Sequence, residues 1–184
     1  MKLAGTALER IAIVVASLVL SIGLIAVLSG FFASHDPAGV SGSAGAVGQQ
    51  FLDLGHVHLS PGELRPPYDS DPPTSGAHVP EPVLHDRAML TNDQLLTALE
   101  AGDVVIMYGG RQPPAGLAAL AKSVAGPFTP TLAADGQAVV LARRHGTQGL
   151  ISLAWARMLR TDMVADPLLR KFAEHYLGQG APTH

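Results

Sequence analysis

The sequence predicts an α+β protein with one N-terminal transmembrane helix. A small mixed β-sheet domain with about three packed helices and a loop-rich, proline-containing segment is expected to follow it. Three observations predict this class. An uncharged apolar run occupies residues 11–32, a stretch rich in Gly, Ala and Ser follows it, and helical and strand-like patterns alternate after residue 90. The length of 184 residues suits one ordinary domain with additions.

The composition excludes several classes of function. Lys and Arg number 12 against 15 Asp and Glu, which gives a formal net charge of −3. Nucleic-acid binding requires a basic face, so no nucleic-acid partner is expected. The chain has no Cys, which excludes disulfides, thiolate catalysis and Cys-ligated metal sites.

The apolar run at residues 11–32 reads "IAIVVASLVLSIGLIAVLSGFF" and carries no charge. About 20 such residues span a bilayer core of roughly 30 Å, whereas a secretory signal has an apolar region of roughly 7–15 residues. We therefore expect an uncleaved anchor. Lys2 and Arg10 precede the run, and the next basic residue is Arg65. The positive-inside rule then predicts a single-pass protein of the bacterial inner (cytoplasmic) membrane, with residues 1–10 cytoplasmic and the C-terminal domain periplasmic (extracytoplasmic).

Mostly small residues recur on one face of this predicted helix. Membrane helices pack closely along such residues, which predicts contact with other transmembrane helices of a complex as well as with lipid. The alternative is that Gly and Ala are simply frequent in membrane helices. The predicted helix-packing residues are Ala12, Ala16, Val19, Gly23, Ala26 and Gly30.

Residues 33–50 are expected to form a linker, because "PAGVSGSAGAVGQQ" has the composition of flexible connecting segments. The extracytoplasmic α+β domain is then predicted at residues 51–184. Its first part, residues 51–90, is rich in prolines and turn residues, with one short strand expected at residues 56–59.

Local signals predict the later elements in order. A helix at residues 92–101 has Thr91 and Gln94 as a capping box, and the buried-strand run "VVIMY" follows at residues 104–108. A helix at residues 113–124 and a strand at residues 137–143 come next. A second strand at residues 150–159 contains Trp155, and a final helix at residues 166–177 begins at an Asp-Pro pair. These elements predict three or four strands.

The stretch "YDSDPPTSGAH" at residues 68–78 resembles the Y-x-x-x-PPTSG-x-H signature of a bacterial domain-of-unknown-function family of single-pass membrane proteins. Three weaker matches follow in order: Leu99-Glu100-x-Gly102, "AWAR" at residues 154–157, and Phe172. The resemblance spans roughly residues 54–180 and implies a membrane-anchored extracytoplasmic domain, with no reaction to transfer. The family pattern has His where this chain has Ala101, so a site shared by His78 and that second His lacks half its residues here.

We interpret residues 68–78 as a rigid structural loop held by His78. Pro fixes backbone angles, Thr and Ser hydroxyls bond nearby amides, and Gly permits a bend. The residues predicted to form this structural motif are Tyr68, Pro72, Pro73, Thr74, Ser75, Gly76 and His78, together with Trp155.

Four histidines fall within thirty residues: His56, His58, His78 and His85. On a strand, His56 and His58 point to one face, and a loop brings His78 beside them. Three imidazoles suit Cu or Zn, so His56, His58 and His78 are the predicted metal ligands. The alternative is that these histidines only bond the backbone of the loop.

No motif supports catalysis or the binding of an organic cofactor. The chain has no G-x-S-x-G sequence and no phosphate-binding loop. Glu100 is a conceivable general base, but a solvent-facing residue at the end of a helix is the simpler interpretation. We therefore expect a protein that is not an enzyme and has no catalytic or cofactor-binding residues.

Two functions follow as expectations. The first is a membrane-anchored periplasmic accessory subunit, structural in role, of a larger membrane complex, with respiratory and photosynthetic complexes as the candidates. The second is a periplasmic Cu- or Zn-binding protein that uses the histidines of residues 56–85.

Overall fold

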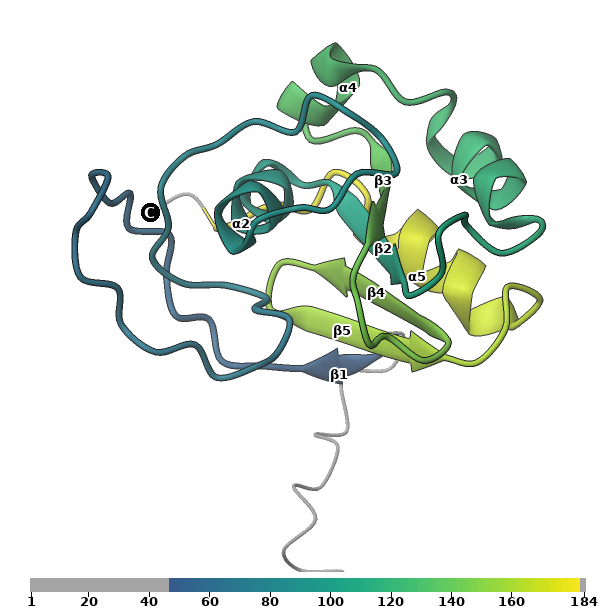
Figure 1. Ribbon diagram of the computed structural model, residues 1–184, viewed down its shortest axis with the longest axis horizontal. Helices are drawn as coiled ribbons and strands as arrows, with labels where there is room; N and C mark the ends of the chain where they lie inside the picture. The colour runs from purple at the N-terminus through teal and green to yellow at the C-terminus, as the bar shows by residue number, and fades with distance from the viewer. Residues whose placement is uncertain (1–46, 183–184) are drawn as a thin grey trace, which may run out of the picture. The chain divides into compact units, whose positions relative to one another are not determined.

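The computed structural model describes residues 47–182 (Figure 1). Their centre is a mixed sheet of five strands in the order β1-β5-β4-β2-β3. The strands are β1 (Gln49–Gln50), β2 (Val104–Tyr108), β3 (Val139–Arg143), β4 (Leu150–Ala154) and β5 (Arg157–Thr161). The helices of this part are α2 (Asn92–Ala101), α3 (Leu117–Ala125), α4 (Pro130–Ala134) and α5 (Pro167–Tyr176).

Among the strands of residues 47–182, one pair is parallel. Strand β2 pairs in parallel with β3, with Ile106 opposite Leu141, and antiparallel with β4 on its other side. Strands β4 and β5 form a tight antiparallel hairpin, and the two-residue strand β1 pairs antiparallel with β5. A parallel pair needs a crossover, which the chain between β2 and β3 provides with α3 and α4 (Figure 1).

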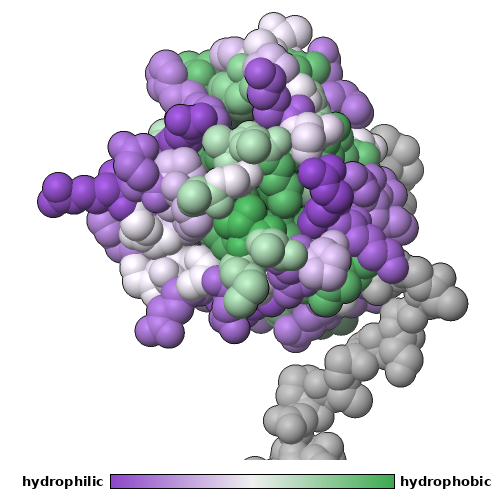
Figure 2. All heavy atoms as spheres, turned by 90° about the vertical axis from the view of Figure 1, so that its right-hand side faces the viewer, coloured by the Kyte–Doolittle hydropathy of each residue, from purple (hydrophilic) through white to green (hydrophobic). Residues whose placement is uncertain are grey.

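Helices cover both faces of the sheet. Alternate residues of β2 belong to two separate apolar clusters: Ile106 packs with residues of α3 and α5, whereas Val105 packs with residues of α2 and α4. Because both faces are covered, β2 is apolar at every position rather than at every second one. On the face that carries α3 and α5, apolar atoms also reach the surface and gather near its centre (Figure 2). Met163 and Leu168 are exposed apolar residues of this part of the chain.

Strand β3 forms one edge of the sheet, and a loop covers it. The Leu141 amide donates to Asp86 Oδ1, and the Leu141 carbonyl accepts from the Arg87 amide. The Arg143 amide donates to the Ala88 carbonyl. The loop thus forms hydrogen bonds with backbone N–H and C=O groups of β3 that would otherwise be free to pair with a strand of another chain.

Within residues 47–182, the predicted fold class is corrected in two respects, the transmembrane helix and the element counts. Among residues 47–182, no helix is both long enough and apolar enough to cross a membrane. This part has five strands and four helices instead of three or four strands and about three helices. The predicted span at residues 11–32 and all its helix-packing residues lie outside the described residues: Ala12, Ala16, Val19, Gly23, Ala26 and Gly30.

Several predicted elements differ in their bounds. The single strand expected at residues 150–159 is two strands, β4 and β5, joined at Trp155 and Ala156. Ala156 has φ 53°, which closes the hairpin without the glycine that usually marks such a turn. Helix α3 begins at Leu117, four residues after its expected start, and the short helix α4 was not predicted. Strand β1 lies in the last residues of the predicted linker.

Other predictions are confirmed. Thr91 and Gln94 form the capping box of α2, and Gly102 ends that helix in the left-handed conformation with φ 116°. Asp166 caps α5, whose first residue is Pro167. Residues 51–90, all described, are loop-rich as predicted, but the strand expected at residues 56–59 is absent; the segment takes part only in the isolated bridges His58–His78 and Met89–Arg143.

Candidate functional site

The 68–78 loop is bonded to the chain that precedes it. Ser75 Oγ donates to the Leu52 carbonyl and accepts from the Leu54 amide, both at 3.0 Å. The Gly76 amide donates to the Gly55 carbonyl at 2.9 Å. Because Ser75 is fully buried and its hydroxyl is used twice, it joins the two segments and is not presented as a nucleophile.

Gly76 sits where no other residue fits without strain. Its φ is 118°, and a Cβ built there lies 3.1 Å from the ring of Tyr68. The Tyr68 hydroxyl donates to the Ala77 carbonyl at 3.1 Å, so the ring closes over the bend. The motif also contains a cis Asp71–Pro72 peptide bond, and its buried members include Pro72, Pro73 and Thr74.

This frame fixes His78 in one orientation. Its side chain is fully buried, and Nδ1 lies 3.0 Å from the Gly76 carbonyl. A carbonyl oxygen can only accept, so Nδ1 carries the hydrogen and Nε2 points to the other side of the ring. Within the described part of the chain, Nε2 has no hydrogen-bond partner.

His58 and Glu100 meet at this nitrogen. Glu100 Oε2 lies 3.1 Å from His78 Nε2 and 2.9 Å from His58 Nε2. The contact of Glu100 with His78 has the distance of an ion pair but lacks the geometry of a hydrogen bond. The contact of Glu100 with His58 is also a hydrogen bond. One ligand atom from each of the three residues lies within 4.8 Å of the other two.

Two elements bring these residues together. His58 and His78 face each other across their isolated parallel bridge, where the Leu59 amide donates to the His78 carbonyl and the His78 amide donates to the Val57 carbonyl. The rings are 5.4 Å apart and nearly perpendicular. Glu100 comes from the last turn of α2, beside the helix face that packs Leu99 into the core.

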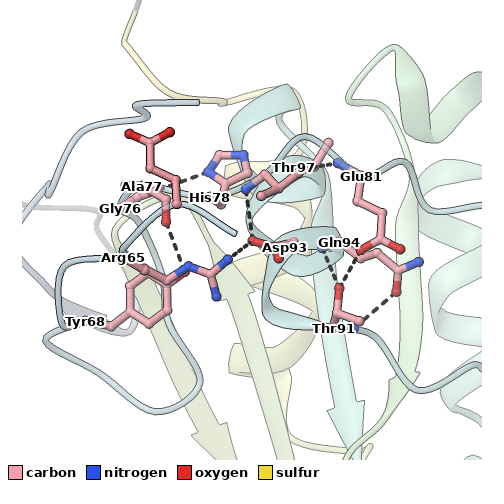
Figure 3. A network of polar contacts seen from close by, with 12 residues as sticks. Arg65, Tyr68, Gly76, Ala77, His78, Glu81, Thr91, Asp93, Gln94 and Thr97 are labelled. Atoms are coloured by element: carbon pink, nitrogen blue, oxygen red, sulfur yellow. Dashed lines mark hydrogen bonds and ion pairs between the residues drawn. The ribbon is translucent and has the colours of Figure 1, made fainter. Parts of the chain in front are cut away.

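Helix α2 also holds the chain on the far side of His78 (Figure 3). Asp93 Oδ1 accepts from the Val79 amide at 3.0 Å and from the Arg65 guanidinium. Thr97 Oγ1 accepts from the Glu81 amide at 2.9 Å. The helix that supplies Glu100 therefore also positions the backbone next to His78.

The site is open on one side only. The His58 side chain is 52% exposed and that of Glu100 is 22% exposed, whereas His78 is fully buried. A solute therefore approaches the group at His58 and Glu100, whereas His78 Nε2 itself is buried. The buried imidazole on the other side keeps its position through the bond to Gly76.

The predicted metal ligands are only partly brought together. His58 and His78 meet, but His56 is not in the group and its ring instead contacts Trp155 edge to face, with centroids 6.3 Å apart. The strand expected at residues 56–59 is a single bridge at His58, so the rule that alternate residues share a face does not apply. His85 is exposed and also outside the group.

The third member, Glu100, was not predicted as a ligand. The sequence identified it only as a residue near a helix end, and no short-range spacing links it to histidines 22 and 42 residues earlier. The neighbouring Ala101 does not lie at this group. It lines a small cavity with Val83 and Asp103, because consecutive helical residues point about 100° apart. The difference from the family pattern at Ala101 thus removes no member of the group.

Fold and site together define a mixed-sheet α+β domain that carries a partly accessible histidine–carboxylate group. The chain belongs to the family described as protein of unknown function (DUF3105), whose match spans residues 63–184. His78 and Glu100 lie within that match, and His58 lies before it. Comparison with curated proteins and with solved structures found no match.

Proposed function

We propose that this protein binds one divalent transition-metal ion, Zn(II) or Cu(II), through His58, His78 and Glu100. The observation that carries the proposal is the meeting of three ligand atoms within 4.8 Å, one of them on a buried imidazole. Two imidazoles and a carboxylate are a ligand set that both metals accept.

The spacing of the ligand atoms suits a small cation. Around a tetrahedral Zn(II) with metal–ligand distances of about 2.0–2.1 Å, neighbouring ligand atoms lie about 3.3 Å apart. Glu100 Oε2 lies 2.9 and 3.1 Å from the two imidazole nitrogens. The two imidazole nitrogens lie within 4.8 Å of each other, and the exposed His58 is free to adjust toward tetrahedral spacing.

The buried nitrogen gives a second argument. A neutral His78 with its hydrogen on Nδ1 has a lone pair on Nε2, and a carboxylate oxygen, which also carries lone pairs, lies 3.1 Å from this nitrogen. A cation between the two groups removes this repulsion. The Gly76 carbonyl then acts as the outer partner that typically orients a metal-bound imidazole. Three protein ligands leave a fourth position for water.

A proton is the competing cation, because a protonated His78 would form an ion pair with Glu100. Metal titration separates the two cases. The full chain, purified without a His tag and stripped with a chelator, is titrated with Zn(II) and with Cu(II) by calorimetry, and bound metal is counted by elemental analysis. We expect one ion per chain and an affinity at least about tenfold lower in His58→Ala and Glu100→Gln.

His56→Ala and His85→Ala are the matched controls, because both remove a nearby imidazole that is outside the group. They are expected to bind as the unmodified protein does. Absence of binding, or equal affinity in Glu100→Gln and the unmodified chain, would exclude this function.

The role of accessory subunit in a membrane complex stays a prediction. It was inferred from residues 11–32 and from the linker, which lie outside the described residues except for the last four of the linker. Co-purification from native membranes in mild detergent tests it, and a protein that runs alone as a monomer would contradict it.

A further inference from the structure

Two arginines meet at Asp71, in the part of the 68–78 loop that the histidine–carboxylate group does not use. Arg144, the residue after β3, donates to Asp71 Oδ1. Arg160 of β5 donates to the Asp71 carbonyl at 3.0 Å. Two guanidinium groups of like charge are thus gathered at one residue, and only the first of them is bonded to a carboxylate.

The sheet sets the positions of both arginines. The Arg144 amide donates to the Tyr108 carbonyl at 3.0 Å, which holds the chain where it leaves β3. Arg160 is opposite Ile151 in the antiparallel pairing of β5 with β4. Residues opposite each other share one face of a sheet, so Arg160 and the buried Ile151 lie on the same face. The backbone therefore places the two guanidinium groups before any ligand arrives.

Both arginines line a surface pocket of about 300 Å³. Proteins bind small molecules in pockets of about 300–1,000 Å³, so this one suits a small solute. Its charged lining consists of Arg144, Arg160 and Asp71, with His145 as the remaining titratable residue. Two arginines against one aspartate leave the lining with a net positive charge, which favours an anion.

The guanidinium groups are accessible from this pocket and have donors to spare. The Arg144 side chain is 28% exposed, and Arg160 is an exposed residue of β5. Each guanidinium carries five N–H donors, and the bond to Asp71 uses one of them. The remaining donors are available to a ligand with several acceptor oxygens.

A phosphate group matches this arrangement. It carries a charge of about −1.5 to −2 near pH 7 and three acceptor oxygens, and the planar fork of Arg pairs with two such oxygens at once. Asp71 offers Arg144 a single negative charge, and its side chain is 82% exposed. That carboxylate is therefore free to turn into solvent when a stronger anion approaches Arg144.

We propose that this pocket binds a phosphate group, free or at the end of a phosphomonoester, through Arg144 and Arg160. The Asp71 carboxylate competes with the phosphate for Arg144, while the Asp71 carbonyl keeps Arg160 in place. The site is separate from the histidine–carboxylate group and requires no metal.

The test titrates the full chain in mild detergent, at about pH 7.5, with inorganic phosphate and with glycerol 3-phosphate. Calorimetry measures affinity, and amide NMR shifts at residues 144–148 and 160 locate the ligand. Arg144→Gln and Arg160→Gln are each expected to weaken binding about tenfold, because each removes charge-assisted hydrogen bonds. Tighter binding of glycerol 3-phosphate would identify an ester as the ligand, and the reverse order would identify free phosphate.

Asp71→Asn is the variant that a purely structural role of the arginines does not explain. It removes the competing carboxylate and keeps the carbonyl that accepts from Arg160. We therefore expect phosphate to bind about tenfold more tightly to this variant than to the unmodified chain.

Arg170→Gln is the matched control, because it loses the same charge from an exposed arginine of α5 that pairs with Glu174 and is not in the pocket lining. It should bind phosphate as the unmodified chain does. No binding of either probe, equal weakening in Arg170→Gln and Arg144→Gln, or no gain in Asp71→Asn would overturn the proposal. If one arginine variant fails to fold, the other arginine variant and Asp71→Asn decide.

Discussion

His78 and Asp103 show two ways of keeping a titratable side chain buried. His78 has one ring nitrogen bonded to Gly76 and the other beside the Glu100 carboxylate, so it has a possible charge partner. Asp103 has one oxygen bonded to the Ala138 amide and no charged partner within residues 47–182. Burial without a counter-charge disfavours the ionised form, which raises the pKa of Asp103 to about 7.

The raised pKa of Asp103 makes stability depend on pH. The folded state retains its proton up to about pH 7, whereas the unfolded carboxyl loses it near 3.8. The folded state therefore binds more protons between these values, and the free energy of unfolding falls as the pH rises from about 4 to 7. Against Asp103→Asn, which does not titrate, we expect a relative loss on the order of 4 kcal/mol across this window.

Urea unfolding of the two proteins between pH 4 and 8 measures this difference. The free energy of unfolding of the unmodified protein relative to that of Asp103→Asn should fall between pH 4 and 7 and become constant above pH 7. A difference that is constant with pH, or that grows in favour of the unmodified protein as the pH rises, would contradict the assignment.

At the scale of elements, α2 both carries the proposed ligand Glu100 and positions the loop that carries the proposed ligand His78. Asp93 accepts from the Val79 amide beside His78, and it also bonds Arg65. We expect Asp93→Ala to lower metal affinity about tenfold without removing a ligand, because the backbone next to His78 loses its anchor. Titration with Zn(II) measures the effect.

Thr129→Ala is the control for a general loss of stability. Thr129 caps α4 by accepting from the Leu132 amide, and its removal is expected to cost about 1 kcal/mol. This variant should bind metal as the unmodified chain does. Equal losses of affinity in Asp93→Ala and Thr129→Ala would show that α2 has no specific role at the site.

Local signals explain which elements could be predicted. Helices α2 and α5 have capping residues at their starts, and β2 is a compact apolar run, so all three were found from the sequence. The β4–β5 hairpin was missed because its turn, at Ala156, lacks Gly and Pro within a largely apolar segment. Glu100 was missed as a site residue because tertiary contacts alone bring it to the histidines.

At the scale of the whole described unit, the site joins the loop-rich part of the chain to the helical part. His58 and Glu100 are 42 residues apart, and the bridge between His58 and His78 is the only strand-like pairing within residues 51–80. A metal ion bound there would connect the two parts in addition to the hydrogen bonds that the Val79 and Glu81 amides donate to α2. Its effect on stability should therefore be largest in the loop-rich part.

Hydrogen exchange with and without Zn(II) tests this localisation. The amides of Leu59 and His78, which form the bridge, are expected to exchange more slowly when metal is bound. Amides of α5 that exchange through local opening, rather than through global unfolding, are expected to keep nearly the same exchange rate. At a free metal concentration of 100 times Kd, binding adds about 2.7 kcal/mol to the free energy of unfolding. Glu100→Gln should show neither effect and His56→Ala should show both, since only Glu100 belongs to the group. Protection spread evenly over the sheet, or retained in Glu100→Gln, would place the metal elsewhere.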